Sequence, residues 1–453
     1  MIPAQQVVEL ALQAATVDET IVIVTDRAEA SLRWAGNSMT TNGVSTTRST
    51  TVISIVRQGD TSHTGVNRTS DVNPAAIGGL VAAAEQAAHA APEARDSAPL
   101  LTGKGTPDDW NAPVPETGAA VFADVAASLS RGFGRTDRLY GYAHHVVETT
   151  FLATSTGIRR RFTQPTGTVE VNAKRGGASA WAGVSTPWFA DVSTDALLDD
   201  LALRLGWADR TVELPAGRYE TLMPPSTVAD MMIYLGWSMD GRGAEEGRSA
   251  LSAPGGGTRV GEKLSALPLT MYSDPFAAGL QCAPFVAAAS GSETISVFDN
   301  GMDIGRVDWI RDGVINALAY PRAAAIEFGT TPAIPADNLL MTGGSAELAD
   351  MVAATERGLL LTTLWYIRTV DPTTLLLTGL TRDGVYLIED GEVTAAVNNF
   401  RFNESPLDLL RRATEAGVAE PTLPREWGDW ATRAVMPTLR IPDFHMSSVS
   451  QAQ

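Results

Sequence analysis

Side chains that could hold a metal ion are few in this chain of 453 residues. No histidine is followed directly by glutamate, and no two histidines are three or four residues apart. The helical spacing that brings two imidazoles to one zinc ion is therefore missing. The single cysteine, Cys282, can form neither an intramolecular disulfide nor a thiolate cluster. The five histidines are His63, His89, His144, His145 and His445.

The adjacent His144 and His145 are candidates for a metal pair. They lie in Tyr140–Ala153, whose residues have the character of a strand. Neighbouring residues of a strand point to opposite faces, so both imidazoles could bind one ion only if the strand were interrupted there. We therefore expect each histidine to make an ordinary polar contact.

Motifs for two other kinds of chemistry are incomplete. The sequence Gly-x-Ser-x-Gly, which places a serine nucleophile on a sharp turn, does not occur. The Gly255–Gly257 stretch has a further glycine, Gly261, at the spacing of a phosphate-binding loop. Glu262 stands where such a loop needs lysine. The sequence thus favours neither a serine hydrolase nor a nucleotide-binding loop.

Charge and composition exclude further classes. The formal net charge is −18 and the pI is about 4.7, which disfavours nucleic-acid binding, and the dense basic run is limited to Arg159–Arg161. Apolar residues make up 44%, as in a globular protein. Met1–Ala15 resembles an amphipathic helix and not a signal peptide, and no segment approaches the roughly 18 apolar residues of a membrane span. We expect a soluble cytoplasmic protein.

The elements that must position these residues suggest an α+β fold. Residues 1–95 have the pattern helix, sheet, helix, with a hairpin turn expected at Asn42-Gly43 and a helix cap at Asn73. Residues 96–118 contain many prolines and glycines and few apolar residues, which is typical of a linker. Residues 119–212 form a second α/β unit, and strands dominate residues 213–453. We expect N-terminal α/β units with antiparallel sheets, followed by a β-rich C-terminal domain.

The segment Gly358–Leu410 has the pattern of a β-meander. A single strand is expected at Leu359–Ile367, and hairpin turns at Asp383-Gly384 and Asp390-Gly391. Ser405 and Pro406 are typical of the start of a helix.

This segment resembles the C-terminal domain of the TldD/PmbA (TldE) family. The similarity lies in the stretches LWYIR, VDP, TLLLTGLTRDG, LIEDGE and VNNFRFNESPLDLL, and it extends to Val147–Arg161 and Pro437–Ser447. The resemblance implies a dimer of related subunits that cleaves peptides or unfolded polypeptides inside the assembly.

The resemblance also implies where zinc would bind. In the catalytic branch of the family, a helix with His-Glu-x-x-x-His and a cysteine near the C-terminus hold the ion. The equivalent helix here is Ser226–Gly236, which offers only Asp230 as a weak candidate ligand, and no cysteine follows Cys282. We therefore expect a non-catalytic PmbA/TldE-like subunit without a cofactor, with zinc in a TldD-like partner. Two alternatives stay open: an active metallopeptidase with a divergent site at Asp230 or at the two adjacent histidines, and a homodimeric peptide-binding protein without catalysis.

Candidate contact residues for substrate or partner lie in Asn398–Glu404. Strand alternation places Asn399, Arg401 and Asn403 on one face, where amides and a guanidinium could hold an extended peptide. The alternative is a polar strand end that orients the following helix. Trp365 is either a core residue or part of a groove that holds the same peptide.

Overall fold

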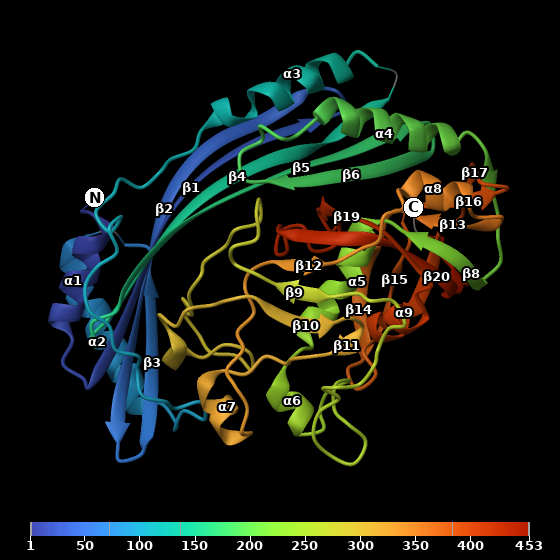
Figure 1. Ribbon diagram of the computed structural model, residues 1–453. Helices are drawn as coiled ribbons and strands as arrows, with labels where there is room; N and C mark the ends of the chain where they lie inside the picture. The colour runs from blue at the N-terminus through green and yellow to red at the C-terminus, as the bar shows by residue number, and fades with distance from the viewer. Residues whose placement is uncertain (1, 72, 136, 383, 452–453) are drawn as a thin grey trace.

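The N-terminal half forms one long antiparallel sheet. The computed structural model describes residues 2–71, 73–135, 137–382 and 384–451. The strand order is β3-β2-β1-β4-β5-β6, and the sheet curves as an arch over the C-terminal half (Figure 1). Its strands are β1 (Glu19–Ala35), β2 (Met39–Gln58), β3 (Thr61–Thr69), β4 (Arg138–Thr154), β5 (Arg159–Arg175) and β6 (Ala178–Thr186).

Helices cover the convex face of this sheet. Alternation along β1 turns Ala30, Leu32 and Trp34 toward one pair of helices, while Val22 and Val24 pack against the other pair. The helices are α1 (Ala4–Ala14), α2 (Ile77–Ala90), α3 (Ala123–Gly132) and α4 (Thr194–Trp207), and the 3₁₀ turns η1 (Pro74–Ala76) and η2 (Ala119–Phe122) precede α2 and α3.

The expected hairpin turn at Asn42-Gly43 is wrong. Both residues lie inside β2, and the turn between β1 and β2 is made by Gly36 and Asn37, with φ of +61° and +66°. Two consecutive residues with positive φ form the type of turn that matches strand twist. The turn is therefore made by Gly36-Asn37, a pair whose composition suits a hairpin turn as well as that of Asn42-Gly43 does.

The two predicted N-terminal units share this sheet. β1 pairs with β4 from Ile21 opposite Thr154 to Ala35 opposite Tyr140. Residues 1–95 and 119–212 thus join through a continuous ladder, and the domain boundaries at 95, 118 and 212 stay a prediction.

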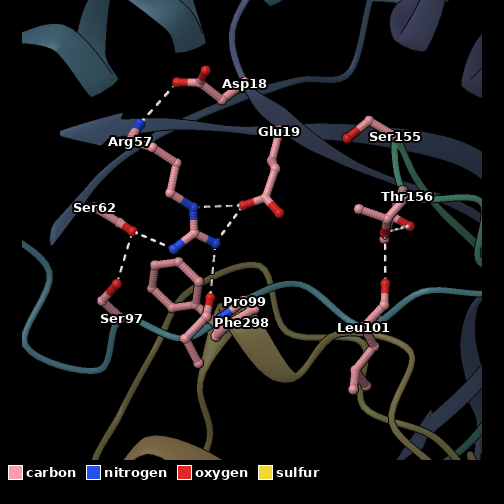
Figure 2. A network of polar contacts seen from close by, with 12 residues as sticks. Asp18, Glu19, Arg57, Ser62, Ser97, Pro99, Leu101, Ser155, Thr156 and Phe298 are labelled. Carbon is pink, nitrogen blue, oxygen red and sulfur yellow. Dashed lines mark hydrogen bonds and ion pairs between the residues drawn. The ribbon is translucent and has the colours of Figure 1, made fainter. Parts of the chain in front are cut away.

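The predicted linker at 96–118 begins between the sheet and the C-terminal half, where Leu100 is buried, and then crosses to the convex face, where Trp110 packs with α1 and α2. Figure 2 shows its anchor: Arg57 bonds to Glu19 and to Ser62, and it also donates to the carbonyl of Ala98 at 2.9 Å. The Thr156 hydroxyl donates to the carbonyl of Leu101 at 2.6 Å. The carbonyls of Ala98 and Leu101 are therefore paired where the segment lies between the two halves.

The C-terminal half is built around a mixed sheet of short strands with the path β11-β10-β9-β12-β20-β8-β13-β16-β17-β7, and β14, β15, β18 and β19 branch from it. The bounds are β7 (Thr211–Val212), β8 (Gly217–Met223), β9 (Met271–Ser273), β10 (Val307–Arg311), β11 (Val314–Ile315), β12 (Leu339–Met341), β13 (Arg357–Leu361), β14 (Trp365–Asp371), β15 (Leu376–Leu380), β16 (Val385–Glu389), β17 (Glu392–Val397), β18 (Phe400–Glu404), β19 (Glu415–Thr422) and β20 (Ala434–Val449). Its helices are α5 (Pro225–Trp237), α6 (Gly241–Glu245), α7 (Arg322–Glu327), α8 (Leu348–Ala353) and α9 (Pro406–Arg412), with the 3₁₀ turn η3 (Val297–Asp299).

Local expectations in this half hold in part. Asp390 and Gly391 form the predicted hairpin turn between β16 and β17, with φ of +49° and +82°. The strand expected at Leu359–Ile367 is wrong, because β13 and β14 are separate strands that belong to different ladders. Asp383 lies outside the described residues. The α+β class with an antiparallel N-terminal sheet and a β-rich C-terminal part is confirmed.

No helix in the described ranges is both long enough and apolar enough to cross a membrane.

Candidate functional site

Helix α5 is the element at which the family resemblance predicts the chemistry. It begins at Pro225, where proline suits the first turn, and its residues from Thr227 to Leu235 are all buried. Asp230 lies in the middle of this run and has no exposed surface. A carboxyl group in such a position needs polar partners from elsewhere in the chain.

Those partners come from residues Leu423–Trp430, which we call the covering segment. The segment connects β19 to β20, and the backbone N–H of Glu426 donates to Oδ1 of Asp230 at 3.0 Å. The Ser226 hydroxyl donates to the Leu423 carbonyl at 2.9 Å, and the Trp427 ring lies 4.8 Å from the Trp237 ring between centroids. The segment is thus bonded and packed along the length of α5.

Burial raises the pKa of Asp230 well above its ordinary value, and the nearby Glu426 carboxylate raises it further. The N–H group of Glu426 acts in the opposite direction. The charged form is disfavoured because α5 and the covering segment exclude water from this carboxyl. Asp230 is poorly placed to bind a metal ion, because it has no exposed surface and its Oδ1 is already bonded to the Glu426 N–H group.

Glu426 itself is fixed by an irregularity in β14. The register of β14 against β15 shifts between Trp365 and Arg368, and Tyr366 has a φ of +56°. Backbone N–H groups of Tyr366 and Ile367 donate to the Glu426 carboxylate at 2.7 and 3.2 Å, and Arg368 Nη1 donates at 3.0 Å. The bulge thus turns two N–H groups toward one carboxylate, an arrangement that suits an anion.

The covering segment also contacts the concave face of the arch. The Tyr142 hydroxyl donates to Oε1 of Glu170 at 2.7 Å and lies 3.3 Å from Oδ1 of Asp429, while Trp181 Nε1 donates to Oε2 of Glu170 at 3.1 Å. Burial raises the pKa of Glu170 and of Tyr142. The guanidinium of Arg425 lies 5.7 Å from the Trp181 ring and 5.3 Å from the Trp365 ring. The segment therefore joins both halves of the molecule.

The adjacent histidines point to opposite faces of β4. His145 is buried, with Nδ1 2.6 Å from the Thr117 hydroxyl and Nε2 2.8 Å from the Pro187 carbonyl. A carbonyl can only accept, so we assign the proton to Nε2 and let Thr117 donate to Nδ1. His144 Nε2 lies 3.8 Å from Oε2 of Glu29 on the concave face. Burial lowers the pKa of both histidines, and both nitrogens of His145 are engaged.

Three of the candidate contact residues, Trp365, Arg401 and Asn403, lie on one face of β14, β15 and β18. Leu380 is the register partner of both Trp365 and Arg401, and Thr378 is the partner of Asn403. Residues in one row of a sheet share a face, so Trp365 and Arg401 lie on the same side two strands apart. Arg401 is exposed, Trp365 and Asn403 are partly exposed, and partly exposed Asn399 directly precedes β18.

A cavity of about 330 Å³ lies beside the covering segment, between the arch and the C-terminal half. Arg433 is in its wall, with Nη1 donating to the Thr166 hydroxyl at 2.7 Å and with an ion pair to Asp337. Trp188 and Leu280 provide apolar surface. A cavity of this size and mixed lining can hold a side chain of a bound peptide.

Sequence reasoning missed the covering segment. The stretch Pro424–Trp430 combines charged and aromatic residues in a connection between strands, and that composition was the available signal. Its partners Tyr142 and Glu170 had no signal beyond strand alternation.

The comparison with family models decides the classification. Residues 216–448 match the model described as the PmbA/TldA metallopeptidase C-terminal domain. The chain belongs to the PmbA/TldD family. None of the curated proteins matches this chain.

Solved structures of PmbA/TldD-like proteins have the same fold over nearly the whole chain. TldE from Thermococcus kodakarensis aligns with a TM-score of 0.77 at 15% identity, covering 97% of this chain and 99% of that one. A candidate modulator of DNA gyrase from Bacteroides thetaiotaomicron aligns with a TM-score of 0.76 at 14% identity, covering 98% of each chain. A candidate modulator of a DNA gyrase from Thermotoga maritima aligns with a TM-score of 0.73 at 15% identity, covering 94% of this chain and 95% of that one.

The residues at α5 of this PmbA/TldD-family chain do not fit a zinc ion. Asp230 is the single carboxylate or imidazole side chain on the helix, and it is bonded to the covering segment. Within the described part of the chain, no group of three or more His, Cys, Asp and Glu side chains could hold a metal. No catalytic step through zinc is derived for this chain.

Proposed function

We propose that this chain is a non-catalytic, TldE-like subunit. It pairs with a TldD-like zinc peptidase of the same family, and the pair cleaves peptides or unfolded polypeptides. The observation that carries the proposal is the covering segment over α5. The Glu426 N–H group bonds to the buried Asp230 carboxyl, where a catalytic site would need a ligand open to metal and substrate.

The packing around α5 supports a structural role for this helix. Met231 and Met232 are buried with Asp230, and Trp427 packs on Trp237 and Tyr234. Opening this space would expose apolar surface and break the contacts of Glu426 with β14. The packing therefore favours a closed element over a site that admits water and substrate.

The proposed contribution to cleavage is to hold the peptide or the partner. Arg401 and Asn403 of β18 and Trp365 of β14 share a face that could contact either, and Asn399 directly precedes β18. The cavity near Arg433 is a further place for a peptide side chain. The cytoplasmic location that we expect from the sequence stays a prediction.

Metal content and peptidase activity test the proposal. The purified chain, a TldD-like homologue and their mixture are compared on an unfolded polypeptide such as casein, with and without a chelator. We expect neither bound zinc nor cleavage for the chain alone, and more cleavage by the mixture than by the homologue. The homologue mixed with an unrelated acidic protein is the control.

Two outcomes would contradict the proposal. Stoichiometric metal and chelator-sensitive cleavage by the chain alone would show an active metallopeptidase with a divergent site. Peptide binding by the chain alone, with no effect on the homologue, would show a peptide-binding protein without catalysis.

A further inference from the structure

The first part of β2 pairs with β1 on one side and with no described strand on the other. β3 pairs with β2 from Thr50 to Gln58, whereas β2 begins at Met39. Residues 39–49 of β2 therefore pair with β1, and no described strand lies on their other side. All residues from Met39 to Thr47 are exposed, and Figure 1 shows this part of β2 at the margin of the arch. We call residues 39–49 the free edge.

The main-chain groups that point outward follow from the ladder pattern. Gln58 and Thr61 flank the two-residue turn between β2 and β3, so they form a hydrogen-bonded pair. Because bonded pairs recur at every second residue, the even-numbered residues of β2 bond toward β3 and the odd-numbered ones toward β1. On the free edge, the N–H and C=O groups of Asn42, Val44 and Thr46 thus point outward.

The free edge has few of the features that protect sheet edges. Proteins commonly block exposed edges with charged side chains, with proline or with short strands. Residues 39–49 contain no proline and one charged residue, Arg48. The guanidinium of Arg48 is buried and bonds to Asp26 and to the carbonyl of Ile2, so it does not extend past the edge. A long unprotected edge of this kind is expected to be covered in the working assembly.

We propose that the free edge pairs with the equivalent edge of a TldD-like subunit. This inference rests on the proposed function and names the surface through which the partner docks. Proteins of this fold align over 97–98% of this chain, so a homologous subunit has an arch with the same edge. Antiparallel pairing of equivalent strands satisfies the outward groups of both, as in an interface with twofold symmetry.

Such pairing would join the two concave faces. The concave side of β1 next to the free edge carries Arg27, Glu29 and Arg33, and Tyr142 and His144 follow on β4. A sheet that continues across the subunits would place these polar residues along one wall shared by both arches. The partner would thereby extend the surface that faces the covering segment.

Proline substitution tests the pairing. Val44→Pro removes an N–H that points outward and leaves the bonds between β1 and β2 intact. Val44→Thr keeps the N–H and is the matched control. Ser179→Pro is a second control, because the same ladder rule places its N–H on the opposite edge of the arch, at β6. Association of each full-length variant with the TldD-like homologue is measured by sedimentation velocity, with circular dichroism as the check on folding.

We expect Val44→Pro to weaken association at least tenfold and both controls to bind as the wild type does. Wild-type binding by Val44→Pro would overturn the edge inference and leave the proposed function standing. If the wild-type chain does not associate with the homologue, the result contradicts both the edge inference and the proposed function.

Hydrogen exchange gives a test that needs no variant. The amides of Asn42, Val44 and Thr46 should exchange more slowly in the complex than in the free chain. Amides of Gly43 and Ser45, already bonded to β1, should change much less. Equal exchange of the outward amides in the free and bound states would overturn the inference even if Val44→Pro failed to fold.

Discussion

At the scale of single residues, the surroundings decide what a carboxyl group does. Asp230 and Glu426 are both acidic and both poorly exposed. Asp230 accepts the N–H group of Glu426, and burial raises its pKa and so disfavours its charged form. Glu426 accepts two N–H groups and a guanidinium, which suit its charge. The same functional group is therefore a buried hydrogen-bond acceptor at one position and an ion-paired anchor at the other.

Asp230→Asn should change how stability depends on pH. The folded-state pKa of Asp230 is raised, so both states are protonated below the unfolded pKa and the aspartate costs nothing there. Above that pKa the unfolded chain ionises first, and stability is lost as pH rises toward the folded pKa. Asparagine cannot ionise and still accepts the Glu426 N–H. Urea unfolding at pH 5 and pH 8 should show the gain of Asp230→Asn growing with pH, and parallel pH profiles would contradict this.

Arg401→Ala should lower cleavage by the mixed subunits several-fold. Arg401 is exposed in the same row of the sheet as Trp365, so its loss should change the free energy of unfolding by less than about 0.5 kcal/mol. Arg411→Ala on α9 removes another exposed arginine and is the control. Unchanged cleavage with unchanged stability would remove Arg401 from the contact surface.

At the scale of elements, a bulge in one strand holds a connection between two others. The irregular register of β14 provides the N–H groups for Glu426, and Glu426 keeps the covering segment against α5. The covering of α5 thus depends on residues of α5, of β14 and of the covering segment, which are far apart in sequence.

Glu426→Ala should release the covering segment. It leaves the N–H groups of Tyr366 and Ile367 without their acceptor, at a cost of about 2–3 kcal/mol. Trypsin should then cleave after Arg425 faster than in the wild type. Arg368→Ala removes only a partner that is 53% exposed and should cost less than about 1 kcal/mol. Equal cleavage rates for the wild type and Glu426→Ala would show that other contacts hold the segment.

At the scale of the whole molecule, the arch and the C-terminal half meet through polar contacts as well as through an apolar core. Ile21, Ile53 and Leu152 of the arch pack against Phe285 and Phe298. Farther along the concave face, the Tyr142 hydroxyl lies between Glu170 and Asp429. The apolar contact provides burial, and the polar one determines where the covering segment lies.

Tyr142→Phe should loosen this second contact. The partly buried Glu170 would lose a hydrogen bond worth about 1–2 kcal/mol, and Asp429 would lose its link to the arch. Tyr140→Phe is the control, because Tyr140 lies on the same strand and face and its ring contacts Lys174. Urea unfolding followed by tryptophan fluorescence should show a lower midpoint for Tyr142→Phe only. Equal midpoints would mean that the Tyr142 hydroxyl does not help to join the halves.

The sequence by itself determined the local elements and the family. Asn73 caps the 3₁₀ turn before α2 as expected, with its side-chain oxygen accepting the N–H of Ala75, and Asp390 and Gly391 make the expected turn. These features depend on neighbours within a few residues, which a sequence displays directly. The stretches between Leu364 and Leu410 carried the family resemblance, and the family-model match confirms it.

Only the tertiary structure decided what closes the site. Asp230 and Glu426 are 196 residues apart, and Tyr142 and Asp429 are 287 apart. Asn42 and Gly43 have the composition of a turn but became part of a strand, because the long ladder with β1 outweighs a local preference. Contacts of this range depend on how whole sheets pack, and no local propensity encodes that.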